Sequence, residues 1–166
     1  MSADVTAADN DTLKLQLGRP LRGVREIVCR CRDGHPTVVE TEPRLPDGTP
    51  FPTLYYLTCP SATAAVSTLE SRGVMREMTD RLADDAELAA AYRAAHDGYL
   101  ATREQIGHVE EIAGVSAGGM PTRVKCLHVL VAHSLAVGPG VNPLGDEALA
   151  MLEPVWSPRT CGWVPE

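Results

Sequence analysis

Residues 118–150 read GGMPTRVKCLHVLVAHSLAVGPGVNPLGDEALA, a stretch that predicts two helices joined by a rigid elbow. Proline is well tolerated at the first helical position, so Pro121 favours a helix over 121–137. Gly138 suits the left-handed residue that commonly ends a helix. Apolar side chains recur between them at intervals of three and four residues, which gives this helix one broad apolar face: Val124, Leu127, Leu130, Val131 and Leu135.

The elbow itself is GPGVNP, residues 138–143. Asn142 is a favourable N-cap residue, and Pro143 then occupies the first helical position. Asp146 stands where we expect the acidic residue of a capping box. The pattern predicts a second helix over 143–152, which is set at a fixed angle to the first. Its buried side is expected to hold Leu144, Ala148, Leu149 and Leu152.

The first half of the chain predicts a sheet and then helices. Alternating side chains and turn residues indicate three strands, which we place at 23–31, 37–42 and 53–58. Helical periodicity with capping residues then predicts helices at 60–72, 74–83 and 85–107. The expected fold class is therefore α+β, with a small three-stranded antiparallel sheet followed by about five helices packed on it.

We expect a single domain over residues 20–152, because no internal repeat or linker divides the chain. Residues 1–19 are predicted to form an N-terminal tail, disordered over 1–10 and with a short helix over 11–18. Residues 153–166 contain three prolines and show no periodicity, so they predict a C-terminal tail. Trp156 and Trp163 are expected to hold that tail against the surface.

Composition excludes several classes of protein. The net charge of −7 argues against nucleic acid or an anionic membrane as a partner. No apolar run approaches the ~18 residues of a membrane-spanning helix. The polar, acidic N-terminus does not resemble a signal peptide, so a cytoplasmic location is expected. In that compartment, the five cysteines favour buried thiols, metal ligands or reactive thiols over a disulfide framework.

Three motifs carry a resemblance to a known family: LPDGTPFPTLYYLTCP (45–60), RLADDAELAAAYRAAH (81–96) and the 118–149 part of the opening stretch. The chain resembles the bacterial family catalogued as domain of unknown function 501 (DUF501) over roughly residues 20–152. That resemblance implies no particular activity. The resemblance also implies that genes of this family lie beside an exopolyphosphatase gene and a septum-formation gene. It further implies that relatives have histidine at the position of Cys59.

A metal site is the leading functional hypothesis, with zinc or an iron–sulfur cluster as the cofactor. Cys31 and Cys59 follow the first and third predicted strands, whose ends should lie at one edge of the sheet. Cys126 and His133, seven residues apart, should share one face of the predicted helix, whereas His128 should point away from both. Cys126 with either histidine would complete the ligand set. Free cysteine is also commonly a plain core residue, which is the alternative.

A reactive thiol is the second hypothesis. Cys59 is predicted at a helix N-terminus, where the helix dipole favours the thiolate. Paired with His128 or His133, it could act as a nucleophile. The alternative is an N-capping thiol without chemistry.

The third hypothesis is an anion site. Residues 116–125 form a glycine-rich loop before a predicted helix, with Arg123 and Lys125 close by, and this arrangement favours phosphate. It predicts an enzyme or binding protein for a phosphorylated or polyphosphate ligand. The alternative for both residues is a solvated or ion-paired helix face. A non-catalytic adaptor in a cell-division or polyphosphate pathway, which binds a protein partner through the tail tryptophans, is a further reading. Whether the chain is an enzyme stays open.

Overall fold

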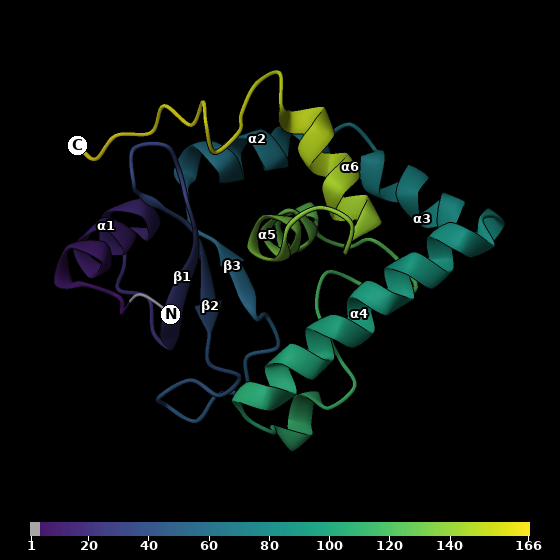
Figure 1. Cartoon of the computed structure of the whole chain (residues 1–166), viewed down its shortest axis with the longest axis horizontal. Helices are drawn as coiled ribbons and strands as arrows, with labels where there is room; N and C mark the ends of the chain where they lie inside the picture. Colours follow the sequence, from purple (N-terminus) through teal and green to yellow (C-terminus); the bar gives the residue numbers. More distant parts are fainter. Residues whose placement is uncertain (1–3) are drawn as a thin grey trace.

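Helix α5 (Leu127–Val137) lies at the centre of the molecule, and the other elements surround it (Figure 1). The sheet lies on one side of α5, and α2, α4 and α6 lie around the rest. This arrangement is seen in a computed structural model that describes residues 4–166. Eight of its eleven residues are apolar, and they are distributed around the whole circumference, which is typical of a helix enclosed by other elements.

The order of elements confirms the predicted α+β fold class. In the part of the chain that the structure describes, three strands form one sheet, and five α-helices and a short 3-10 helix follow it. Within residues 4–166, no helix is both long enough and apolar enough to cross a membrane. The elements are α1 (Ala7–Leu17), β1 (Val24–Arg30), β2 (Pro36–Thr41), β3 (Tyr55–Leu57), α2 (Pro60–Glu70), α3 (Val74–Asp84), α4 (Ala86–Ile106), η1 (Glu110–Ile112), α5 and α6 (Pro143–Leu152).

The sheet has the order β1-β2-β3, and both neighbouring pairs are antiparallel. The β1–β2 pairing shifts register at three places, which bends the hairpin. Because β1 and β3 run in the same direction, their C-terminal ends lie on the same side of the sheet. Cys31 and Cys59 follow these two ends, as predicted. Val38 and Val39 in β2 are fully buried, so this central strand is covered on both faces.

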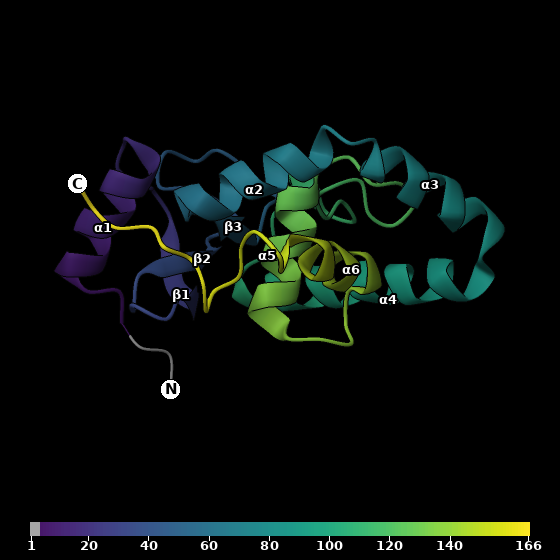
Figure 2. The same ribbon diagram turned by 90° about the horizontal axis from the view of Figure 1, so that it is seen from above.

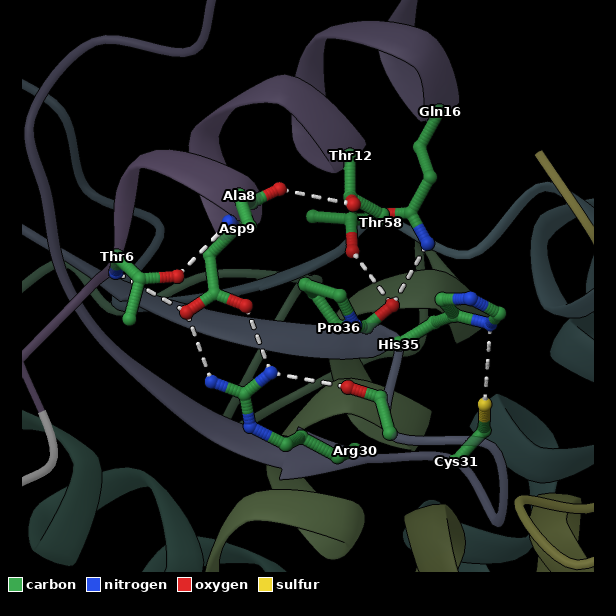
Figure 3. A network of polar contacts seen from close by, with 11 residues as sticks. Thr6, Ala8, Asp9, Thr12, Gln16, Arg30, Cys31, His35, Pro36 and Thr58 are labelled. Carbon is green, nitrogen blue, oxygen red and sulfur yellow. Dashed lines mark hydrogen bonds and ion pairs between the residues drawn. The ribbon is translucent and has the colours of Figure 1, made fainter.

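Helix α1 covers the side of the sheet that faces away from α5 (Figures 1 and 2). Thr6 and Asp9 form a capping box at its start, and Asp9 also makes an ion pair with Arg30 of β1 at 2.8 Å (Figure 3). Gln16 Nε2 donates to the first carbonyl of β2 at 2.8 Å. Disorder over 1–10 was therefore the wrong prediction for residues 7–10, because a local cap and a distant arginine together hold this polar segment. The part of that prediction that concerns residues 1–3 lies outside the described residues.

The start of α5 also differs from its prediction. The helix begins at Leu127, not at Pro121. Residues 118–125 instead close a tight turn, in which Lys125 N donates to the Gly118 carbonyl at 2.7 Å. The amide of Val124 donates to the side chain of Thr79 at 3.0 Å, so it makes no helical hydrogen bond. Val124 fits the helical period, but it is a buried loop residue.

The second predicted helix is confirmed at both ends. Helix α6 begins at Pro143, and Asn142 caps it by accepting from Gly145 N at 3.0 Å. Asp146, which we expected to complete a capping box, accepts instead from Gly140 N at 2.8 Å. It lies one position too far along the helix for the box, so it stabilises the elbow instead.

The C-terminal residues are irregular, as predicted, but they are tightly attached. They run from the end of α6 past α2 toward α1 (Figures 1 and 2). Trp156 is only 2% exposed and belongs to the core, and Trp163 packs edge-on against His35 with ring centroids 5.1 Å apart. Arg32 N donates to the Pro158 carbonyl at 2.9 Å, which ties the segment to the β1–β2 turn.

Close packing of α5 against α6 predicts a specific effect of mutation. A Cβ at Gly145 would lie 2.3 Å from the Leu130 carbonyl oxygen, and a backbone atom cannot move aside cheaply. We expect Gly145→Ala to lower the free energy of unfolding by at least about 2 kcal/mol, measured by urea denaturation. Gly98→Ala is the matched control in α4, where the added Cβ meets nothing within 4 Å. It should raise the free energy of unfolding by about 0.5–1 kcal/mol. Equal effects of the two substitutions would contradict this packing.

Candidate metal centre

Three potential metal ligands converge where the end of α2 meets the start of α5. They are Glu70, Cys126 and His128, and their ligand atoms all lie within 4.8 Å of one another. His128 Nδ1 is 2.6 Å from Glu70 Oε1 and 3.9 Å from Cys126 Sγ. The carboxylate and the sulfur therefore approach the same ring nitrogen.

Local backbone geometry explains why Cys126 and His128 meet. Cys126 is the N-cap of α5 and has an extended backbone, with φ −150° and ψ 112°. His128 is the second residue of the helix, so both side chains lie at its first turn. We predicted that His128 would point away from Cys126, which was wrong because the helix does not extend back through Cys126.

The face of α2 supplies the remaining contacts to the ring. His128 Nε2 lies 3.3 Å from the Thr63 carbonyl oxygen and 3.3 Å from Ser67 Oγ. Positions 63, 67 and 70 are separated by four and three residues, so they line one side of a helix. Helix α2 therefore contacts both nitrogens of this imidazole, which fixes the ring plane.

The neighbours of Cys126 favour its thiolate. Burial acts to raise the pKa of Cys126, but the hydrogen bond with His128 and the amide of Val129 together hold it below its ordinary value. The thiol in turn raises the pKa of His128, against the opposing effect of burial, and Glu70 raises it further. A thiolate is the form of cysteine that binds metals and attacks electrophiles.

A cavity of about 310 Å³ lies beside this cluster. Cys126 and His128 form part of its wall, so a small molecule in the cavity would reach them. The other lining residues are hydroxyl-bearing or apolar, and none is lysine or arginine: Thr53, Tyr55, Tyr56, Leu57, Thr63 and Val129.

In the comparison with family models, residues 27–150 match a family described as "Protein of unknown function (DUF501)". The chain belongs to the DUF501 family. This confirms the resemblance drawn from the three sequence motifs. The comparison with curated proteins gave no match, and neither did the comparison with solved structures. All three residues of the Glu70 cluster lie inside the part of this DUF501 chain that the family model matches.

Of the five predicted ligands, the structure brings only Cys126 and His128 together. In the described part of the DUF501 chain, residues 4–166, the Glu70 cluster is the single group of three such ligand atoms within 4.8 Å. Cys31 instead contacts His35, with Sγ 3.8 Å from Nδ1. Cys59 contacts Cys161, with the two sulfurs 3.2 Å apart.

His133, the last of the five predicted ligands along the chain, is a core residue. It is 2% exposed, its ring stacks on Tyr55 at an interplanar angle of 16°, and Tyr99 packs edge-on at 5.1 Å between centroids. Its Nδ1 lies 3.2 Å from the amide nitrogen of Asn142. This environment holds an imidazole in its neutral form between aromatic rings.

The 116–125 loop differs from the predicted anion site. Its residues do not lead directly into a helix N-terminus, because α5 begins only at Leu127. Two of its amides are used inside the loop: Arg123 N donates to the Gly119 carbonyl at 3.1 Å, and Lys125 N donates to that of Gly118. The side chains of Arg123 and Lys125 are exposed. Binding of a phosphorylated ligand there stays a prediction.

Among the residues that sequence reasoning missed are Glu70 and Cys161. Each is brought to its partner by the fold over a long sequence separation, and neither lies in a short motif. The Cys-Leu-His run at 126–128 was the one local signal that could have indicated the paired side chains. Because we placed Cys126 and His128 on one continuous helix, we predicted that their side chains point in different directions.

The core role of His133 predicts how it titrates. Burial lowers its pKa to about 4, from an ordinary value of 6.5. As the pH falls, His133 takes up a proton near pH 6.5 in the unfolded chain but only near pH 4 in the folded chain. The free energy of unfolding should therefore fall by roughly 3 kcal/mol between pH 6.5 and 4. We expect NMR to show His133 neutral down to about pH 4. The exposed His108 beside Glu104 and Glu110 should titrate above 6.5. Titration of His133 near 6.5, or the same pH dependence of stability in His133→Gln, would contradict this.

Proposed function

We propose that this DUF501 protein binds a divalent transition metal ion, with zinc as the best fit, through Glu70, Cys126 and His128. The observation that supports the proposal is the convergence of the Cys126 sulfur and the Glu70 carboxylate on Nδ1 of one imidazole. A sulfur, a nitrogen and an oxygen that face a common point are ligands zinc accepts.

The same geometry argues against a proton-relay triad. In such a triad the nucleophile contacts one ring nitrogen and the carboxylate orients the ring through the other. Here both groups lie on Nδ1, whereas Nε2 contacts a backbone carbonyl and a serine hydroxyl. A histidine held in this way cannot pass a proton between Cys126 and Glu70. It can bind a metal through Nδ1 while Nε2–H donates to the Thr63 carbonyl, a support common among metal-binding histidines.

The distances require only a small adjustment. Zinc bonds are about 2.0–2.2 Å to nitrogen or oxygen and about 2.3 Å to sulfur, which places neighbouring tetrahedral ligands roughly 3.3–3.7 Å apart. The sulfur–nitrogen distance of 3.9 Å is close to that range. The nitrogen–oxygen distance of 2.6 Å must lengthen, which is expected when a metal replaces the proton between those two atoms.

The ligand set also selects among cofactors. Iron–sulfur clusters are held mainly by several thiolates, and this site offers one. Three protein ligands leave the fourth tetrahedral position of zinc for water or a small ligand. The cavity beside Cys126 and His128 would give access to that position. The arrangement therefore fits an exchangeable coordination site better than a closed structural one.

Cobalt titration tests the proposal, because thiolate-bound Co²⁺ gives a charge-transfer absorption band. Reduced, metal-free protein should bind one equivalent with that band, and zinc should displace the cobalt. Cys126→Ser should abolish the band, and Glu70→Gln should weaken binding at least about tenfold while it preserves the side-chain shape.

Cys31→Ser is the matched control, since Cys31 contacts His35 and lies outside the cluster. It should leave the band and the affinity unchanged. Circular dichroism of each variant checks that the fold is retained. Cobalt binding that survives Cys126→Ser, or that is lost in Cys31→Ser, would reject this site.

A further inference from the structure

A second thiol contact lies away from the proposed metal centre, where the C-terminal segment crosses the start of α2. Cys59 Sγ and Cys161 Sγ are 3.2 Å apart, and Ser61 Oγ lies 3.1 Å from the first sulfur and 3.2 Å from the second. Sulfurs joined in a disulfide are about 2.05 Å apart. The two thiols therefore need to approach by only about 1 Å to form a bond.

We propose that Cys59 and Cys161 are a redox-active pair, which a hydroperoxide converts into a disulfide that ties the C-terminal segment to α2. The proposal is independent of metal binding at Glu70, Cys126 and His128. Cys161 also lies beyond residues 27–150, the part of the chain that the family model matches. The pair is thus composed of one residue inside that part and one outside it.

The two thiols differ in a way that assigns their roles. Cys59 is 1% exposed, whereas Cys161 is only partly buried and lies in an irregular segment at the surface. Cys161 is therefore the thiol that a peroxide reaches, and Cys59 is the partner that resolves the product.

Charge stabilisation agrees with that order. Burial raises the pKa of Cys161, but Ser61, the amide of Trp163, Cys59 and the Trp156 indole together hold it below its ordinary value. Burial raises the pKa of Cys59, and the neighbouring Cys161 raises it further. The Cys161 thiolate therefore attacks the peroxide, and the protonated Cys59 thiol beside it reacts in the second step.

The chemistry balances with a hydroperoxide as the oxidant. The Cys161 thiolate attacks the terminal oxygen of ROOH, the O–O bond breaks, and the alkoxide leaves as ROH after it takes up a proton. This gives a sulfenic acid on Cys161. The Cys59 sulfur then attacks the Cys161 sulfur, and hydroxide leaves with the Cys59 proton as water. Two electrons pass from the thiols to the peroxide, and one S–S bond forms.

A metal ion is a weaker explanation for this pair. Within the described residues 4–166, no third histidine, cysteine, aspartate or glutamate ligand atom completes a group with these two sulfurs. Cys29 lies near enough to be influenced by Cys59, but burial raises its pKa to about 11, which disfavours its thiolate. Disulfide formation needs only the two sulfurs already in contact.

The test is oxidation of the full-length protein with one equivalent of hydrogen peroxide, followed by thiol counting and peptide mass spectrometry. We expect the loss of two thiols, a peptide pair linked through Cys59 and Cys161, and full reversal by dithiothreitol. The Cys126→Ser variant should give the same linked pair, which separates this result from any outcome at the proposed metal centre.

Single variants test the assigned order. In Cys59→Ser, the sulfenic acid on Cys161 should persist and be trapped by dimedone, whereas in Cys161→Ser, Cys59 should stay a thiol. Cys31→Ser is the control and should form the disulfide normally. The proposal is overturned if Cys161 stays reduced in the wild-type protein, if Cys59 links to Cys29 or Cys31 instead, or if dimedone labels Cys161 equally with and without Cys59.

Discussion

Burial of helix α5 is the constraint on which the rest of the structure depends. Leu127, Leu130 and Val131 are fully buried, and each such side chain contributes about 1.5–3 kcal/mol relative to exposure. A helix that is apolar on every side needs partners on every side, which the sheet, α2, α4 and α6 supply. Its two buried polar residues must then be satisfied inside the core. His133 contacts Asn142 and two tyrosine rings, and the Ser134 hydroxyl donates to the Asn142 carbonyl.

Packing around α5 also explains why the two candidate sites share one support. Helix α2 lies against the start of α5 and presents Thr63, Ser67 and Glu70 to His128 along one side. Cys59 precedes the same helix on the same side, four positions before Thr63, and contacts the C-terminal segment. The eleven residues of α2 thus hold the thiol pair at one end and the proposed metal centre at the other.

The sequence was sufficient for features fixed by neighbouring residues. The cap at Asn142 and the helix from Pro143 were predictable because N-cap chemistry is local. The start of α5 was not, since Val124 has the same spacing in a buried loop as in a helix, and contacts made by the folded chain, such as that with Thr79, distinguish the two. The role of Glu70 could not be predicted for a related reason, because nothing in its own segment indicates that α2 ends beside Cys126.

The two helix-capping cysteines show why position alone does not define a reactive thiol. Cys59 and Cys126 both stand at the N-cap of a helix, and burial is the largest influence on both, raising the pKa. Cys126 nevertheless has a lowered pKa, because His128 lies beside it, whereas Cys59 has a raised one with Cys161 as its neighbour. A helix N-terminus favours a thiolate at either position. The partner side chain therefore decides which thiol ionises, and that partner is set by tertiary packing.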